Sequence, residues 1–443
     1  MKSTILAPLA TICLALAACG GGAAPASSAP PSPASAAAKP STAAAPSSAA
    51  ATSAKPAASA SAATSAAAKP AGSAAAGGPI KIGWISSLTG SQGAIGKPMD
   101  NGFKMYLAEV GNKAGGRDIQ VVTEDEASDP KTGLDKVKKL VEQDNVDLLA
   151  GLILTPSTYP SVDYLDKSAP KKVLLVGTNA GGNDMDTTRK SDLFVRVSFS
   201  NAQANIPMGD YVYNTLGYKN VYLTYSDFAA GPEKVETFAA AFKKLGGNIV
   251  GTEKPPLGST DFAAYLTKIK ASNADATYNF EPGADGVAFV KQYSQFLDKN
   301  KIKMLGAGDN VDDTLLPAEG PAAVGAVTTF TYYSTLDNPE NKKFSTDYQA
   351  KYNDSSNAYA VQGYDGAHLI VDALNKTNGS ADPKALMGAM LGAKWNSPRG
   401  PISISPDYHD VVQNVYVAET KLVNGKPSNV VTKTFEAQQP VAK

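Results

Sequence analysis

Three short segments of this 443-residue chain carry hydroxyl side chains, two of them together with glycine, a composition found in loops that bind small anions. The first, residues 86–96, follows an apolar run and leads into an amphipathic helix pattern. Loop amides and a helix N-terminus both direct partial positive charge at a ligand in such a position. The segment predicts either an anion site, with Ser87 and Thr89 as candidate ligands, or an ordinary strand-to-helix connection.

Two further segments, residues 155–159 and 178–181, have the same character and also follow apolar runs. Their candidate ligand-binding residues are Thr155, Ser157, Thr178, Asn179 and Ala180. None of the three segments contains Lys or Arg. If the preceding strands are parallel, the three segments meet at one edge of a sheet, where hydroxyls and backbone amides would hold a carboxylate.

Three residues in the second half of the chain extend this prediction. Phe228, Phe280 and Asp309 each stand at or just after the end of an apolar run. Two aromatic rings and an acid opposite an anion site suit an amino acid, whose ammonium would pair with Asp309, because a buried carboxylate needs a partner. Taken singly, each aromatic side chain is equally explained by core packing.

The strands that position these segments are predicted by apolar runs that alternate with amphipathic helix patterns. The expected strands cover residues 80–85, 118–122, 146–149, 173–176, 221–225, 248–251, 276–280 and 303–305. Their spacing is that of βαβ units, so two consecutive sets of four predict an α/β fold with two parallel, helix-covered sheets. Residues 401–404 and 411–417 alternate like antiparallel strands.

The N-terminus has the pattern of a lipoprotein signal peptide, assigned to residues 1–19. Lys2 precedes a short apolar core, and the LAAC ending resembles the bacterial lipobox, in which Cys19 becomes the lipid-modified N-terminus. A plain signal peptide is the alternative. Residues 20–78 are almost entirely Ala, Ser, Pro, Gly and Thr, which predicts a disordered linker. We therefore expect an exported protein, lipid-anchored to the bacterial cell envelope and facing the periplasm or the cell exterior.

Signs of catalysis are scarce in the sequence. The net charge is zero, which argues against nucleic acid as a partner. Nucleophile-elbow, zinc-protease and phosphate-loop motifs are absent, and Gly90, Gly93 and Gly96 lack the dinucleotide-binding spacing. His368 and His409 are interpreted as structural. We expect no enzymatic activity, no cofactor and no metal.

One acidic cluster leaves two interpretations open. Asp125, Glu126 and Asp129 lie close together in the chain, after the second expected strand. They fit either a cation site or a solvated turn that caps the next helix.

Four segments carry a resemblance to a known family. They are IKIGWISSLTG from residue 80, DFAAYLTKIKASNADATYNF from 261, GYDGAHLIVDAL from 363 and YHDVVQNVYVAE from 408. In order and spacing they resemble the type I periplasmic binding proteins, in the Leu/Ile/Val-binding branch of the substrate-binding proteins of ABC transporters. The similarity covers about residues 79 to 425.

The resemblance implies two α/β lobes joined by three crossovers, near residues 199–202, 330–333 and 401–410. Lobe 1 would comprise residues 79–200 and 332–404, and lobe 2 residues 201–331 and 405–443. The implied ligand contacts are Thr155, the segment 178–181, Phe228, Phe280 and Asp309. The chain departs from the family pattern in three ways: Ile95 replaces a frequent Tyr at a candidate ligand contact, Thr155-Pro156-Ser157 replaces a Ser-Gly pair, and the disulfide of some relatives is absent.

The sequence therefore predicts a monomeric lipoprotein that captures a small amino acid or related carboxylate and delivers it to an ABC permease in the membrane. The alternatives are a ligand sensor of the same fold and a binder of amides or aromatic acids. An enzyme on a doubly wound fold is the third possibility, and the missing motifs argue against it.

Overall fold

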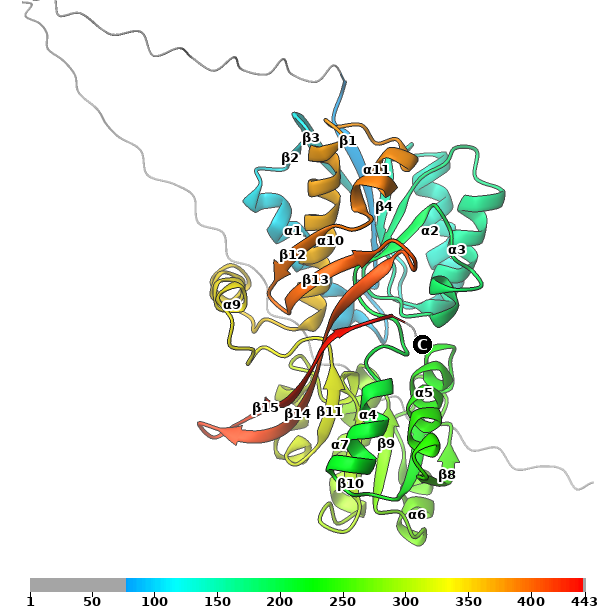
Figure 1. Ribbon diagram of the computed structural model, residues 1–443, viewed down its shortest axis with the longest axis vertical. Helices are drawn as coiled ribbons and strands as arrows, with labels where there is room; N and C mark the ends of the chain where they lie inside the picture. The colour runs from blue at the N-terminus through cyan, green and yellow to red at the C-terminus, as the bar shows by residue number, and fades with distance from the viewer. Residues whose placement is uncertain (1–76, 441–443) are drawn as a thin grey trace, which may run out of the picture. The chain divides into compact units, whose positions relative to one another are not determined.

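The computed structural model describes residues 77–440 (Figure 1). The predicted signal peptide, Cys19 and nearly all of the predicted linker lie outside these residues. Within residues 77–440 no helix combines the length and the apolar character needed to cross a membrane.

The first lobe is built on a six-stranded sheet in the order β2-β3-β1-β4-β5-β6. These strands are β1 (Ile80–Ser86), β2 (Lys113–Ala114), β3 (Arg117–Asp125), β4 (Leu148–Gly151), β5 (Leu175–Gly177) and β6 (Phe194–Arg196). All neighbours are parallel except the short β2–β3 hairpin. The carboxyl ends of β1, β4 and β5 therefore lie at the same edge, as the sequence predicts.

Helices from both ends of the chain cover this sheet. They are α1 (Gly93–Glu109), α2 (Pro130–Glu142), α3 (Thr155–Lys167), α10 (Ala358–Lys376) and α11 (Pro383–Met390). Helices α1 and α10 lie side by side (Figure 1). A Cβ on Gly102 would lie 1.8 Å from the carbonyl oxygen of Ala360, so glycine allows this close approach.

A nine-stranded sheet in the described residues, in the order β12-β13-β14-β11-β10-β9-β7-β8, with β15 also paired to β14, forms the second lobe and extends through β14 to β12 and β13, which lie beside α10 in the first lobe (Figure 1). Its strands are β7 (Asn220–Tyr225), β8 (Asn248–Glu253), β9 (Ala276–Phe280), β10 (Lys303–Ala307), β11 (Val327–Phe330), β12 (Lys394–Ser397), β13 (Gly400–Ser405), β14 (Asp410–Val423) and β15 (Lys426–Gln438). Strands β7 to β11 are parallel, whereas β12 to β15 pair antiparallel.

The remaining helices are α4 (Ile206–Asp210), α5 (Ala230–Lys244), α6 (Ala263–Ala271), α7 (Ala284–Phe296), α8 (Leu316–Glu319) and α9 (Pro339–Tyr352). The chain passes from lobe to lobe after β6, after β11 and between β13 and β14 (Figure 1). The predicted α/β fold with two doubly wound lobes and three crossovers is thereby confirmed.

Two buried arginines fix the crossovers to the first lobe. Arg196, at the end of β6, pairs with Asp186 at 2.5 Å and donates to Asp410 at 3.0 Å. Arg399 pairs with Asp365 at 2.8 Å, and its guanidinium also donates to the Ser198 carbonyl at 2.8 Å. Buried charges that are paired and hydrogen-bonded in this way hold their backbone segments in place.

Candidate ligand-binding site

A small cavity lies between the two lobes at the carboxyl ends of their parallel strands. Its lining residues are Gln92, Ile95, Ile153, Leu154, Thr155, Asn179, Gly181, Phe199, Asn201, Phe228, Ala230, Lys234, Phe280, Pro282 and Asp309. The volume is about 40 Å³. That space fits a few water molecules, so an aromatic or amino-acid ligand requires the walls to separate.

Six residues that the sequence singles out line this cavity: Ile95, Thr155, Asn179, Phe228, Phe280 and Asp309. They come from distant parts of the chain, and parallel pairing brings them together. Thr155 begins α3 directly after β4, so the positive end of a 13-residue helix faces this region. The Asn179 side chain donates to Gln362 of α10 at 2.7 Å, which fixes the loop after β5.

The other five candidates do not line the cavity, because their polar groups contact the first lobe itself. The Ser87 hydroxyl donates to Glu126 at 3.0 Å, and the exposed Thr89 hydroxyl donates to Asp125 at 2.7 Å. The Thr178 hydroxyl lies 3.2 Å from the Met99 sulfur.

Ser157 and Ala180 complete that set. Ser157 is buried under α2, where a Cβ on Gly133 would meet its Oγ at 2.7 Å. The Ala180 carbonyl accepts from Arg196 at 3.3 Å. Direct ligand contacts from these five residues stay a prediction, since small polar residues at strand ends also cap and brace the loops themselves.

The acidic cluster after β3 is divided among structural roles. Asp129 caps α2 by accepting from the Thr132 amide at 2.7 Å. Glu126 is fully buried and accepts from the Ile153 amide at 2.8 Å, which holds the cavity loop in place. Burial raises the pKa of Glu126. Within residues 77–440 no group of acidic, histidine or cysteine side chains is arranged for a metal.

Lys234 is the cavity residue with the largest effect on its chemistry, and the pattern at the strand ends does not reveal it. Its ammonium lies 2.5 Å from Asp309 Oδ2, and only 4% of Lys234 is exposed. The premise that Asp309 has no cationic partner in the protein is therefore wrong. Lys234 does not follow a strand, but it lies one helical turn before the buried Phe238 in α5, which is a signal that it faces inward.

Aromatic rings from three segments surround this ion pair. The Phe228 and Phe280 rings are stacked, with centroids 5.8 Å apart. The Lys234 ammonium lies 4.5 Å from the Phe280 centroid and 4.8 Å from that of Phe199, which belongs to the first crossover. An ammonium at such distances is attracted to the ring faces. The cavity thus offers phenyl surfaces, side-chain amides and an acid, Asp309, that is already paired with Lys234.

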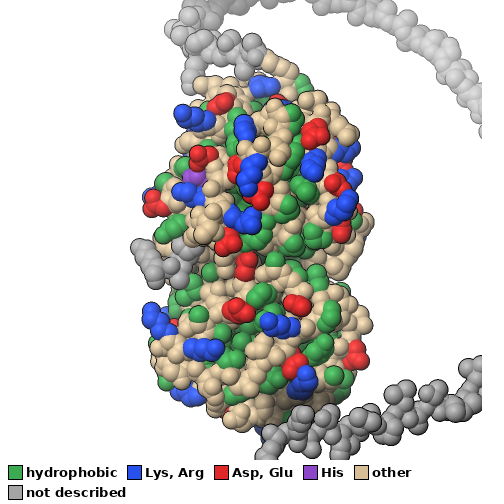
Figure 2. All heavy atoms as spheres, turned by 90° about the vertical axis from the view of Figure 1, so that its right-hand side faces the viewer, with side chains coloured by type: hydrophobic (Ala, Val, Ile, Leu, Met, Phe, Trp, Pro, Cys, Tyr) green, Lys and Arg blue, Asp and Glu red, His purple; other side chains and the backbone are tan. Residues whose placement is uncertain are grey.

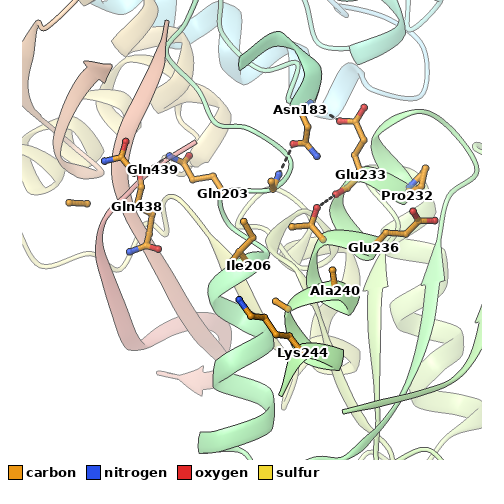
Figure 3. Close-up of a pocket in the computed structure, with 14 residues that line it drawn as sticks. Asn183, Gln203, Ile206, Pro232, Glu233, Glu236, Ala240, Lys244, Gln438 and Gln439 are labelled. Carbon is orange, nitrogen blue, oxygen red and sulfur yellow. Dashed lines mark hydrogen bonds between the residues drawn. The ribbon is translucent and has the colours of Figure 1, made fainter. Parts of the chain in front are cut away.

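A larger groove of about 930 Å³ runs along the outer face of α5 (Figure 3). Glu233 at its edge accepts hydrogen bonds from the Tyr159 hydroxyl, the Asn183 amide and the Asn201 side chain, each at 2.9 Å. These donors belong to the first lobe and the first crossover, so Glu233 connects the lobes. Acidic and basic side chains are interspersed on the adjoining surface (Figure 2).

Comparisons with known proteins agree with this architecture. The sequence profile of the family described as Periplasmic binding protein matches residues 79–427. Leu/Ile/Val-binding protein homolog 6 of Brucella melitensis is 33% identical over 365 residues, 81% of this chain and 92% of the relative.

Two solved structures are also similar. A solute-binding protein of an ABC transporter from Rhodopseudomonas palustris BisB5, in complex with 3,4-dihydroxybenzoic acid, is 37% identical with a TM-score of 0.77, covering 82% of this chain and 98% of that one. Its counterpart from strain HaA2, in complex with p-hydroxybenzoic acid, is 34% identical with the same TM-score and coverage. The chain therefore belongs to the type I periplasmic binding proteins, as a substrate-binding protein of an ABC transporter.

Proposed function

We propose that this protein captures a small aromatic carboxylate outside the cytoplasm and delivers it to an ABC importer. The observation that carries the proposal is the pairing of Lys234 with Asp309 inside a cavity walled by three phenylalanine rings. An amino-acid site needs an acid that is free to meet the ligand ammonium. Here that acid already has a buried partner, and the remaining surface is suited to a ring.

The groups around the cavity suggest how such a ligand would be held. Its carboxylate would lie toward the first lobe, near the N-terminus of α3, the Thr155 hydroxyl and the Asn179 side chain. Its ring would lie among Phe199, Phe228 and Phe280. The hydroxybenzoic acids bound by the two Rhodopseudomonas palustris proteins have this combination of groups.

A branched-chain amino acid is the second candidate. The observation in its favour is the Leu/Ile/Val-binding designation of the Brucella melitensis relative, which is 33% identical. That ligand would require Lys234 to leave Asp309, so that the amino acid's ammonium could take its place.

Calorimetry on the purified protein with 4-hydroxybenzoate, benzoate, L-leucine and L-phenylalanine distinguishes the two candidates. We expect 4-hydroxybenzoate to bind at least about 100-fold more tightly than either amino acid, because close like charges cost several kcal/mol. Tighter binding of L-leucine than of any aromatic acid would overturn the proposal in favour of amino-acid transport.

The proposal includes membrane anchoring through acyl chains on Cys19. The support is the LAAC ending of the apolar N-terminal segment and the composition of residues 20–78. An anchored binding protein remains close to the permease that it supplies. A cysteine that carries more than one acyl chain is sufficient for such an anchor.

A further inference from the structure

The Lys234 ammonium lies where two aromatic faces and a carboxylate converge in the cavity. Its distances are 2.5 Å to Asp309 Oδ2, 4.5 Å to the Phe280 centroid and 4.8 Å to the Phe199 centroid. These groups would also surround the ammonium of a bound amino acid. Lys234 therefore stands, as part of the protein, where a cationic ligand group would otherwise sit.

We propose that Lys234 determines ligand selectivity. Its ammonium fills the position beside Asp309 that a cationic ligand group would take, so the site disfavours ligands with an ammonium there and binds ligands that place a neutral hydroxyl donor there. This inference rests on the proposed function and specifies its substrate class as hydroxylated aromatic acids. Lys234 acts by charge and occupancy, whereas Phe199, Phe228 and Phe280 supply the surface for the ring.

The second carboxylate oxygen of Asp309, Oδ1, explains why the site can bind a ligand hydroxyl. Lys234 pairs with Oδ2, and among the described residues no hydrogen bond is donated to Oδ1. Asp309 lines the cavity, so a ligand O–H can donate to this oxygen. A hydrogen bond to a carboxylate oxygen is stronger than one to a neutral acceptor.

The position of Lys234 on α5 explains why the site disfavours a ligand ammonium. The residue lies near the start of this 15-residue helix with only 4% of its surface exposed, so its stem is packed between the lobes. A ligand ammonium at Asp309 would lie within a few ångströms of the Lys234 ammonium in a site that is largely buried from bulk solvent. Two cations at that separation repel strongly when little solvent screens them.

A matched pair of ligands isolates the ammonium: 4-(hydroxymethyl)benzoate and 4-(aminomethyl)benzoate differ only in carrying a hydroxyl or an ammonium at the end opposite the carboxylate. The purified full-length protein is titrated with both, along with 4-hydroxybenzoate. The variants are Lys234→Met, Lys234→Arg and the double variant Lys234→Met/Asp309→Asn. Lys244→Met, an exposed cation of the same helix outside the cavity, is the control. Thermal unfolding of each variant reports whether it is folded.

We expect the wild type and Lys244→Met to prefer the hydroxymethyl acid over the aminomethyl acid by at least about 100-fold. Lys234→Met should lower that ratio at least about tenfold and gain binding of the aminomethyl acid, because Asp309 is then free to pair with an ammonium. Lys234→Arg keeps the charge and should keep the preference. The double variant should lose the preference without gaining tight binding of the aminomethyl acid.

The outcomes separate the two levels of the proposal. If the wild type binds neither 4-(hydroxymethyl)benzoate nor 4-hydroxybenzoate, the aromatic-acid function fails, and the role of Lys234 fails with it. If the wild type binds these acids but the ratio is unchanged in Lys234→Met, the function stands and Lys234 is not the selectivity residue. Should Lys234→Met fail to fold, an unchanged ratio in the double variant overturns the inference equally.

Discussion

Glu281 follows β9 directly and is buried beside the cavity wall formed by Phe280 and Pro282. One of its oxygens accepts from the Asn310 side chain at 3.0 Å, and the other has no hydrogen-bond partner in the described residues. Burial raises the pKa of Glu281 to about 8, and the nearby Asp285 adds to the increase. At neutral pH this carboxyl group is therefore largely protonated in the folded protein.

This pKa gives stability a pH dependence of definite sign. Between about pH 4.5 and 8 the folded state holds a proton on Glu281 that the unfolded state has lost. The stabilisation is complete below pH 4.5 and is lost as the pH rises through 8. Relative to Glu281→Gln, the wild-type free energy of unfolding should fall by several kcal/mol across that range, since one pKa unit is worth about 1.4 kcal/mol.

Urea denaturation of both proteins at several pH values measures this difference. Glu436→Gln, at an exposed position of β15, is the control and should follow the wild-type curve. Parallel curves for Glu281→Gln and the wild type would show that Glu281 is charged throughout.

Two neighbouring residues of helix α5 have different roles. Lys234 faces the cavity, whereas Glu233 accepts hydrogen bonds from Tyr159, Asn183 and Asn201 across the boundary between the lobes. Successive residues of an α-helix point about 100° apart, so one residue can face the ligand cavity while its neighbour faces the boundary between the lobes. The Tyr159 hydroxyl next to Glu233 has a raised pKa, chiefly because it is buried, and so remains a donor.

Glu233→Ala should weaken the binding of every ligand by the same factor, roughly 10- to 100-fold, because it removes hydrogen bonds that join α5 to the first lobe and would break if the lobes separated. The loss should appear mainly as faster dissociation. Surface plasmon resonance with two aromatic acids measures both rates. Glu236→Ala, one turn further along the same groove, should bind as the wild type does. A change in the preference between the two acids would contradict a role in closure.

The sequence predicts most elements near the cavity, because buried parallel strands are apolar throughout and each is followed by a helix. It does not predict strands β2, β6, β11, β12 and β15 or helices α4, α8 and α9. Helix α9 buries only Asn341, Phe344 and Tyr348 and is otherwise polar, and β15 is an edge strand that buries a single residue. Lys234 is missed for another reason: whether a helical lysine faces solvent or a second lobe depends on tertiary packing.

At the scale of the whole molecule, the anchor and the folded part are separate features of the sequence. Cys19→Ser should release the protein from membranes and leave its ligand affinity unchanged, because the ligand cavity is built from residues 92–309. Fractionation of cells after a salt wash, followed by calorimetry on the soluble variant, measures both effects. Retention of Cys19→Ser in the membrane fraction would exclude lipidation as the anchor.

The pairing of α1 with α10 sets the order in which this protein can be made. Residues 93–109 pack against residues 358–376, so a ribosome must complete more than four-fifths of the chain before the first lobe can gain its covering helix. Domains usually fold in the order of synthesis. Here, however, the first strands of the chain are covered by α10, which is synthesised near the end. Contacts between such distant segments slow folding. The first lobe therefore lacks α10 for most of the time that the chain is being synthesised.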